Sequence, residues 1–276
     1  MNFTQMKILL NKTSLTKSLR HFSDIGFVPT MGSIHKGHLS LVSKSNQICD
    51  KTVVSIFVNP KQFNNKKDFK TYPKNIKKDL KLLNQSKKVD FVYIPKFKDI
   101  FKNNKKPKIK LIKKDKILCA KFRRGHFEGV LDVMDRLTDI IRPNKIFMGN
   151  KDFQQMILVR KYLKKKYNIN VVGCKTIREK NKVALSSRNY LLSKGNLILA
   201  GKIVRKLINV KKNIKNKKNK NKYLLTVKNN FQKQFKIKID YLELRNINNL
   251  KLSNIINTSR LFVAYYLNGV RLIDNL

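Results

Sequence analysis

Two histidines three positions apart, His35 and His38, stand beside two glycines in the segment PTMGSIHKGH, residues 29–38. The chain has only four histidines among its 276 residues. The segment follows an apolar run and precedes LSLVSKSNQI, which has helical spacing, so it predicts a turn from a strand into a helix. Backbone N–H groups at a helix start favour an anion, and glycine lets a phosphate approach the main chain. Both imidazoles could then donate hydrogen bonds to phosphate oxygens.

A second chemically suggestive segment, ALSSRN at residues 184–189, offers two hydroxyls and an arginine. Together they could bind an anion. Taken alone, this segment would be read as a plain serine-rich turn, and a His-x-x-His pair as ordinary surface side chains at a helix start. The pairing of the two segments is what favours chemistry, because His-x-Gly-His resembles the nucleotide-binding signature of nucleotidyltransferases and class I aminoacyl-tRNA synthetases.

Short apolar runs predict the elements that position these segments. Runs rich in Val, Ile and Phe predict buried parallel strands at 24–30, 52–60, 89–95, 144–150 and 169–177. Helical spacing predicts helices over 129–143, where Pro143 ends the pattern, and over 153–167, which ends in basic residues. Strands that alternate with helices imply an α/β fold built on a Rossmann-like, doubly wound parallel sheet.

The character of the chain changes near residue 176, and we expect two domains, 1–175 and 176–276. The second is expected to be a smaller α+β lid domain, with strands in 238–246 and 260–274 and a hairpin at Asn268-Gly269. The Lys/Asn-rich segment 211–222 predicts a solvated helix face or a surface loop.

Composition limits the classes of protein. The net charge of +47 suggests nucleic acid, but lysines occur in every region, often beside asparagine, as drift toward A/T-rich codons would produce. We therefore expect no specific nucleic-acid partner. No run approaches the roughly 20 apolar residues of a membrane span, and the start of the chain does not have the form of a secretory signal. Three widely spaced cysteines predict reduced core thiols in a cytoplasmic protein.

Six blocks in register carry a resemblance over nearly the whole chain: FVPTMGSIHKGHLSLV, VVSIFVNPKQFNNKKDFKTYPK, RRGHFEGVLDVMDRL, FMGNKDFQQMILVR, IREKNKVALSSRN and YLNGVRLIDNL. They closely resemble the pantothenate synthetase (pantoate–β-alanine ligase) family. The resemblance implies an enzyme that uses ATP and Mg²⁺ to make a pantoyl adenylate, releases pyrophosphate, and then lets the amine of β-alanine displace AMP. It also implies a homodimer. A carboxylate that is ionised at neutral pH needs no general base for the first step.

The resemblance implies site residues as well. The implied ATP ligands are Met31, Gly32, Ser33, Ile34, His35, Lys36, Gly37, His38, Gly149, Asn150, Lys151, Asp152, Ile177, Leu185, Ser186, Ser187 and Arg188. Among them, His38 is implied as a proton donor, with His35 and Lys151 as further catalytic groups. Gln62 and Gln155 match the glutamines that hold pantoate, and amides can both donate and accept hydrogen bonds.

Other residues are placed less directly. Arg123 and His126 are expected near the same pocket, and His21 at the surface. Three positions depart from the family pattern: Asn150 and Lys67 stand where acidic residues are usual, and Lys88 where glycine is common before a strand. Two rival functions remain open from sequence. One is another adenylyl-transferring enzyme of the superfamily, against which the two glutamines argue, and the other is an RNA-binding protein.

Overall fold

The computed structural model describes residues 5–63, 66–101 and 109–276, with only the main chain described at 66 and 67. The chain divides into two compact units, Met1–Thr176 and Ile177–Leu276. This division lies one residue after the boundary expected from the sequence. The side chain of Lys67, one of the departures from the family pattern, lies outside the described residues.

The first unit is built on a six-stranded sheet in which every strand pairs in parallel with its neighbours, in the order β1-β4-β3-β2-β5-β6. Its elements are β1 (Lys7–Leu9), α1 (Lys12–Leu19), β2 (Ile25–Thr30), α2 (Lys36–Ile48), β3 (Lys51–Ile56), η1 (Pro60–Gln62), α3 (Lys66–Thr71), α4 (Ile76–Gln85), β4 (Phe91–Tyr93), α5 (Phe97–Ile100), η2 (Lys113–Asp115), α6 (Leu118–Phe122), α7 (His126–Ile141), β5 (Lys145–Gly149), η3 (Asn150–Asp152), α8 (Phe153–Tyr167) and β6 (Asn170–Cys174).

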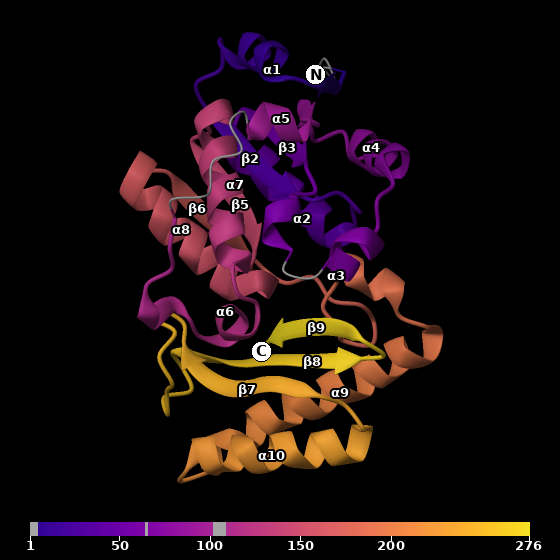
Figure 1. The fold of residues 1–276 in the computed structure, drawn as a ribbon, viewed down its shortest axis with the longest axis vertical. Helices are drawn as coiled ribbons and strands as arrows, with labels where there is room; N and C mark the ends of the chain where they lie inside the picture. The colour runs from indigo at the N-terminus through magenta and orange to yellow at the C-terminus, as the bar shows by residue number, and fades with distance from the viewer. Residues whose placement is uncertain (1–4, 64–65, 102–108) are drawn as a thin grey trace. The chain divides into compact units, whose positions relative to one another are not determined.

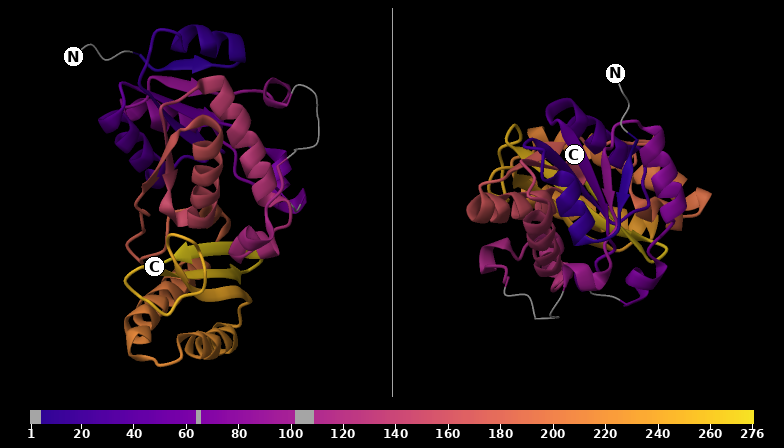
Figure 2. Two further views of the ribbon diagram at one scale, coloured as in Figure 1. Left: turned by 90° about the vertical axis from the view of Figure 1, so that its left-hand side faces the viewer. Right: turned by 90° about the horizontal axis from the view of Figure 1, so that it is seen from above.

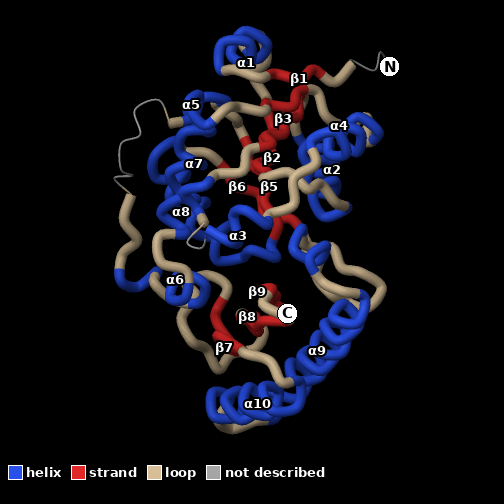
Figure 3. Tube along the Cα trace, turned by 45° about the vertical axis from the view of Figure 1, so that its right-hand side comes forward, coloured by secondary structure: helices blue, strands red, loops and turns tan. Residues whose placement is uncertain are grey.

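Helices cover both faces of this sheet. Figures 1 and 3 show α2 and α4 on one side of the strands and α7 and α8 on the other. Val28, Val54 and Val92, from three neighbouring strands, join Val42 of α2 and Leu83 of α4 in one buried cluster. Because side chains alternate across a strand, Phe27 and Val53, both fully buried, face the opposite helical layer. The predicted Rossmann-like, doubly wound sheet is confirmed.

The second unit is a smaller α+β fold with a three-stranded antiparallel sheet in the order β7-β8-β9. Its elements are η4 (Ser187–Leu191), α9 (Lys194–Asn213), η5 (Ile214–Asn216), α10 (Lys220–Phe235), β7 (Ile239–Asn246), β8 (Ser259–Leu267) and β9 (Val270–Asn275). Figure 2 shows α9 and α10, in orange, beside the yellow strands. Ile203 and Leu207 of α9 pack with Phe231 of α10 and with Leu261 and Val263 of β8.

Most predicted elements are present, with shorter bounds for the strands. The hairpin is confirmed, because Asn268 and Gly269 have φ values of 46° and 75° and join paired strands. The predicted helix over 153–167 matches α8 in full, whereas β1 was not predicted. The segment 211–222 ends α9 and begins α10; most of its side chains are exposed, but Ile214 is fully buried.

The structure also describes the three cysteines and the turn before β4, which the sequence had singled out. Cys49, Cys119 and Cys174 are all buried, as predicted for core cysteines. The turn before β4 bends at Lys87, which has a φ of 52°, and Lys88 follows it with its ammonium 3.0 Å from Ser43 Oγ. A lysine therefore holds the left-handed position of this turn.

None of the helices among the described residues is both long enough and apolar enough to cross a membrane.

Candidate functional site

The loop between β2 and α2 is folded around one buried carboxylate. Asp79, on α4 and 2% exposed, accepts the N–H of Ser33 at 2.8 Å and that of Ile34 at 2.7 Å. Gly32 has a φ of +79°, and a Cβ there would lie 2.8 Å from the Asp79 carboxylate. A side chain at position 32 would thus be both strained and obstructed. The loop owes its shape to this carboxylate.

Four N–H groups of this loop and of the helix start donate within the protein. Gly32 donates to Thr30 Oγ1 at 3.1 Å, Ser33 and Ile34 donate to Asp79, and Gly37 donates to His35 Nδ1 at 3.1 Å. Each already has an acceptor within the protein. In this conformation an anion at the turn would be bound largely by side chains, because these four N–H groups are already bonded within the protein.

The two histidines lie face to face at the start of α2. His35 is the N-cap residue of the helix, and its ring stacks on that of His38 with centroids 4.0 Å apart and an interplanar angle of 21°. Because His35 Nδ1 accepts the Gly37 N–H, the proton of a neutral His35 must sit on Nε2. The cap thus fixes the tautomer and leaves an N–H donor at the far edge of the ring.

Both imidazoles are held neutral. Burial, followed by the nearby Lys151 ammonium, lowers the pKa of His35 from 6.5 to about 4, against an opposing effect of Asp152. Burial and the neighbours His35 and Lys151 lower the pKa of His38 well below its ordinary value. Neutral rings still donate one hydrogen bond each, so the pair can act on phosphate oxygens without carrying charge.

Lys151 reaches the histidines because of the strand order. It lies in η3, directly after β5, and β2 and β5 are adjacent parallel strands whose connections run to opposite sides of the sheet. Ligands of open α/β sheets bind at such a switch point, outside the carboxyl ends of the strands. The Lys151 ammonium lies 3.5 Å from Asp152 Oδ2. The structure therefore brings the segments 31–38 and 149–152 together.

Asn150, which stands where an acidic residue is usual in the family, packs against the neighbouring strand β6. A Cβ on Gly173 of β6 would lie 2.5 Å from Asn150 Oδ1, so the amide sits directly against the main chain of the neighbouring strand. A glycine at position 173 makes room for it.

Gln62 lies buried at the end of η1, with 8% of its surface exposed. Its Oε1 accepts from Asn59 Nδ2 at 3.3 Å, and its Nε2 donates to Met31 Sδ at 2.7 Å. Its carbonyl accepts from His126 Nδ1 at 2.7 Å, and Arg123 donates to the other ring nitrogen of His126 at 2.7 Å. The structure thus joins Gln62 to Met31 and to the His126–Arg123 pair.

The paired glutamines after η3 differ in environment. Gln154 is 5% exposed and donates from Nε2 to the carbonyls of Asp115, at 3.2 Å, and Ile117, at 2.8 Å. It therefore holds α8 to the segment that connects η2 to α6. Gln155, the predicted pantoate ligand, is half-buried in the first turn of α8. On α7, Val130 and Val133 are buried to 3% and 6% exposure.

The predicted nucleotide residues of the second unit form their own ordered turn. Leu185 donates its N–H to the Ile177 carbonyl at 2.9 Å, next to a bridge between Arg178 and Ala184. Ser186 caps η4 by accepting the Arg188 N–H at 3.3 Å, and Ser187 is buried. His21, as expected, is exposed, and it accepts from Arg20 at 2.7 Å.

Sequence reasoning missed two residues that shape the site, Asp79 and Asn59. In the sequence, Asp79 is distinguished by its charge: the chain has 16 acidic against 63 basic residues, and Asp79 lies in a lysine-rich segment. Asn59 is 1% exposed and donates to Gly129 O at 3.0 Å. Among the described residues, no group of three or more His, Cys, Asp or Glu side chains could hold a metal ion.

Comparisons with known proteins agree on one family. The family model described as pantoate–β-alanine ligase matches residues 4–276. The pantothenate synthetase of Flavobacterium psychrophilum is 39% identical over 96% of this chain and 95% of its own length. The chain belongs to the pantoate–β-alanine ligase family. A second relative, the pantothenate synthetase of Leptospira interrogans, is 41% identical over 91% of this chain and 90% of its own.

Solved structures of pantoate–β-alanine ligases have the same fold. Pantothenate synthetase from Thermus thermophilus matches with a TM-score of 0.91 and 30% identity, over 98% of this chain and 99% of that chain. The enzyme from Francisella tularensis, in complex with β,γ-ATP and β-alanine, matches with a TM-score of 0.83 and 34% identity, over 98% and 97% of the two chains. The fold described above is thus that of the ligase family.

The lowered pKa of His35 predicts how stability depends on pH. Above pH 6.5 both folded and unfolded chains hold this ring neutral; between 6.5 and about 4 only the unfolded chain binds the proton. The free energy of unfolding therefore falls as pH falls through this window. We expect His35→Gln to flatten the dependence by up to about 1.4 kcal/mol per pH unit. Urea unfolding at a series of pH values measures it, and identical slopes in both proteins would contradict the assignment.

Proposed function

We propose that this protein joins pantoate to β-alanine at the expense of ATP, through a pantoyl adenylate, with release of pyrophosphate and AMP. Membership of the ligase family supports the overall reaction. The observation that supports the chemistry in this chain is the meeting of His35, His38 and Lys151 at the switch point of the sheet. Such a cluster is suited to binding the phosphates of a nucleotide.

In the first step we assign the chain a role in positioning and charge stabilisation. Pantoate's carboxylate is ionised near neutral pH and can attack the α-phosphorus of ATP without a general base. Negative charge then shifts onto phosphate oxygens, where His35, His38 and Lys151 would donate hydrogen bonds. The lowered pKa of His38 favours a role as a neutral hydrogen-bond donor over one as a proton-transferring acid.

We assign the rest of the nucleotide to residues beside this cluster and in the second unit. Asp152 follows Lys151 and can accept from the ribose hydroxyls, while Gly149 and Asn150 lead the main chain to it. In the second unit, Ile177 is proposed for adenine and residues 185–188 for the triphosphate. Mg²⁺ would enter as the MgATP substrate, because Mg²⁺ in such enzymes is bound largely by phosphate oxygens.

Pantoate is assigned to the two glutamines. It carries two hydroxyls and a carboxylate on a compact body with two methyl groups. The amides of Gln62 and Gln155 can orient the polar groups, and the buried Val130 and Val133 offer apolar surface for the methyls. A reaction between small metabolites requires neither nucleic acid nor membrane. We propose that the enzyme works in the cytosol, as a homodimer.

The proposed reaction predicts a partial reaction. Exchange of labelled pyrophosphate into ATP should require pantoate and Mg²⁺ but not β-alanine, because the amine enters only after the adenylate has formed. The measurement is exchange with pantoate, with unrelated carboxylic acids, and with no acid. Equal exchange with unrelated acids would reject the substrate assignment.

Removal of the His38 ring should slow the chemical step. A preorganised donor to a developing charge is typically worth roughly 10²–10³ in rate, so His38→Ala should lower kcat by that order and weaken ATP binding far less. His21→Ala, at an exposed histidine, is the control and should leave kcat unchanged. Near-normal turnover of His38→Ala would remove this residue from the catalytic groups.

Replacement of either glutamine should affect pantoate selectively. A site built to bond a hydroxyl loses discrimination when its partner is removed, so Gln62→Ala and Gln155→Ala should raise KM for pantoate and weaken its preference over a deoxy analogue. KM for ATP should change little, and the exposed Gln85→Ala serves as control. A rise in KM for ATP with an unchanged value for pantoate would place the glutamines in the nucleotide site.

A further inference from the structure

The turn that carries Gln62 lies directly on helix α7. A Cβ on Gly129 of α7 would come within 2.7 Å of the Lys61 carbonyl carbon and 2.9 Å of Gln62 Cα. On one side of this contact, Asn59 Nδ2 donates to the Gly129 carbonyl at 3.0 Å. On the other, His126 donates to the Gln62 carbonyl at 2.7 Å. The main chain of η1 is thus fixed to one helix.

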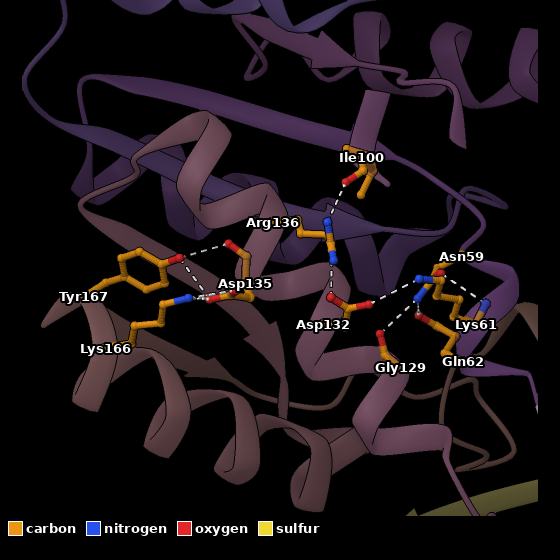
Figure 4. A network of polar contacts seen from close by, with 10 residues as sticks. All are labelled: Asn59, Lys61, Gln62, Ile100, Gly129, Asp132, Asp135, Arg136, Lys166 and Tyr167. Carbon is orange, nitrogen blue, oxygen red and sulfur yellow. Dashed lines mark hydrogen bonds and ion pairs between the residues drawn. The ribbon is translucent and has the colours of Figure 1, made fainter. Parts of the chain in front are cut away.

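One turn along α7, a buried ionic cluster extends this attachment. Asp132 is 4% exposed; its Oδ1 accepts from Arg136 Nε at 2.7 Å, and its Oδ2 lies 3.6 Å from Lys61 Nζ. Arg136 also donates to the Ile100 carbonyl at 3.2 Å. Figure 4 shows Asp132 between the two cations, with Lys61 reaching it from the turn that carries Gln62.

Both cations of this cluster also lie on the same aromatic ring. Lys61 Nζ is 4.0 Å and the Arg136 guanidinium carbon 4.7 Å from the centroid of Phe101. Attraction to the ring face adds to the ion pairs and restricts where the two side chains can go. Lys61 is thereby held at two points, its main chain against Gly129 and its ammonium between Asp132 and Phe101.

Because the Asp132 carboxylate is buried, its ion pairs differ from those at the surface. Exposed pairs contribute little, but a buried charge that loses its partner is strongly destabilising. Asp135, on the same helix, pairs with the exposed Lys166 at 2.7 Å and accepts from Tyr167 at 2.9 Å. Figure 4 shows this second pair well away from Gln62. The two aspartates therefore offer a matched comparison.

We infer that Asp132 is a positioning residue for pantoate, which acts through Lys61 to hold η1, and with it the Gln62 amide, in register with α7. The inference rests on the proposed role of Gln62 in binding pantoate. Asp132 is not proposed to touch the substrate. Its effect passes from its carboxylate to the Lys61 ammonium and along one residue of main chain to Gln62.

Two variants test the inference. Asp132→Asn keeps the shape of the side chain and removes its charge, while Lys61→Met keeps the length of the side chain and leaves the Asp132–Arg136 pair intact. Pantoate-dependent pyrophosphate exchange gives KM for each substrate and kcat. We expect KM for pantoate to rise about 5- to 20-fold in both, because a small misplacement of a positioning group is costly, with KM for ATP within about twofold. The double variant should be no worse than the more affected single variant.

Asp135→Asn is the control, and it should leave KM for pantoate unchanged. Thermal unfolding of every variant separates positioning from loss of fold, and Lys61→Met decides the matter if Asp132→Asn does not fold. Equal changes in both KM values, an unchanged KM for pantoate in Lys61→Met, or the same rise in Asp135→Asn would overturn the inference. Absence of pantoate-dependent exchange in the wild-type protein would overturn the proposed function itself, and the inference with it.

Discussion

The loop between β2 and α2, with the two histidines that follow it, depends on hydrogen bonds to the carboxylate of Asp79. By accepting the N–H groups of Ser33 and Ile34, the carboxylate fixes a loop that would otherwise have several ways to connect β2 to α2. The fixed loop sets where His35 caps the helix, and the cap sets the tautomer of the ring. A single buried acid on α4 thus helps to set which edge of the His35 ring presents a hydrogen-bond donor.

Sheet topology supplies the second requirement. Because β2 and β5 are neighbours, the segments that follow them meet although they are far apart in the sequence. Lys151 can then stand beside the histidines and help keep them uncharged. One permanent cation beside two neutral donors gives a site that attracts phosphate without its charge depending on small changes in pH near neutrality.

Periodicity in the sequence was enough to predict the doubly wound sheet, α8 and the Asn-Gly hairpin, because these features depend on local patterns of apolar residues and turn residues. The histidine segment was singled out by its residue types, their spacing and its resemblance to a nucleotide-binding signature. Such local patterns could not predict that the N–H groups of Ser33 and Ile34 bond to Asp79, since this acceptor lies on α4, more than one element away. Asp132 and Lys61 could not be singled out from the sequence for the same reason: they interact through a tertiary contact, which no local pattern indicates.

The close approach of Gly129 to η1 also limits which codons position 129 can carry. Every glycine codon begins with two guanines, so mutational pressure toward A and T, which suits lysine and asparagine, acts against glycine at its first two bases. The chain has only 10 glycines. At Gly32 the positive φ and the Asp79 carboxylate, and at Gly129 the main chain of Lys61, leave no room for the residues that such pressure would supply. Gly32 and Gly129 therefore mark two positions where geometry requires glycine whatever the base composition favours.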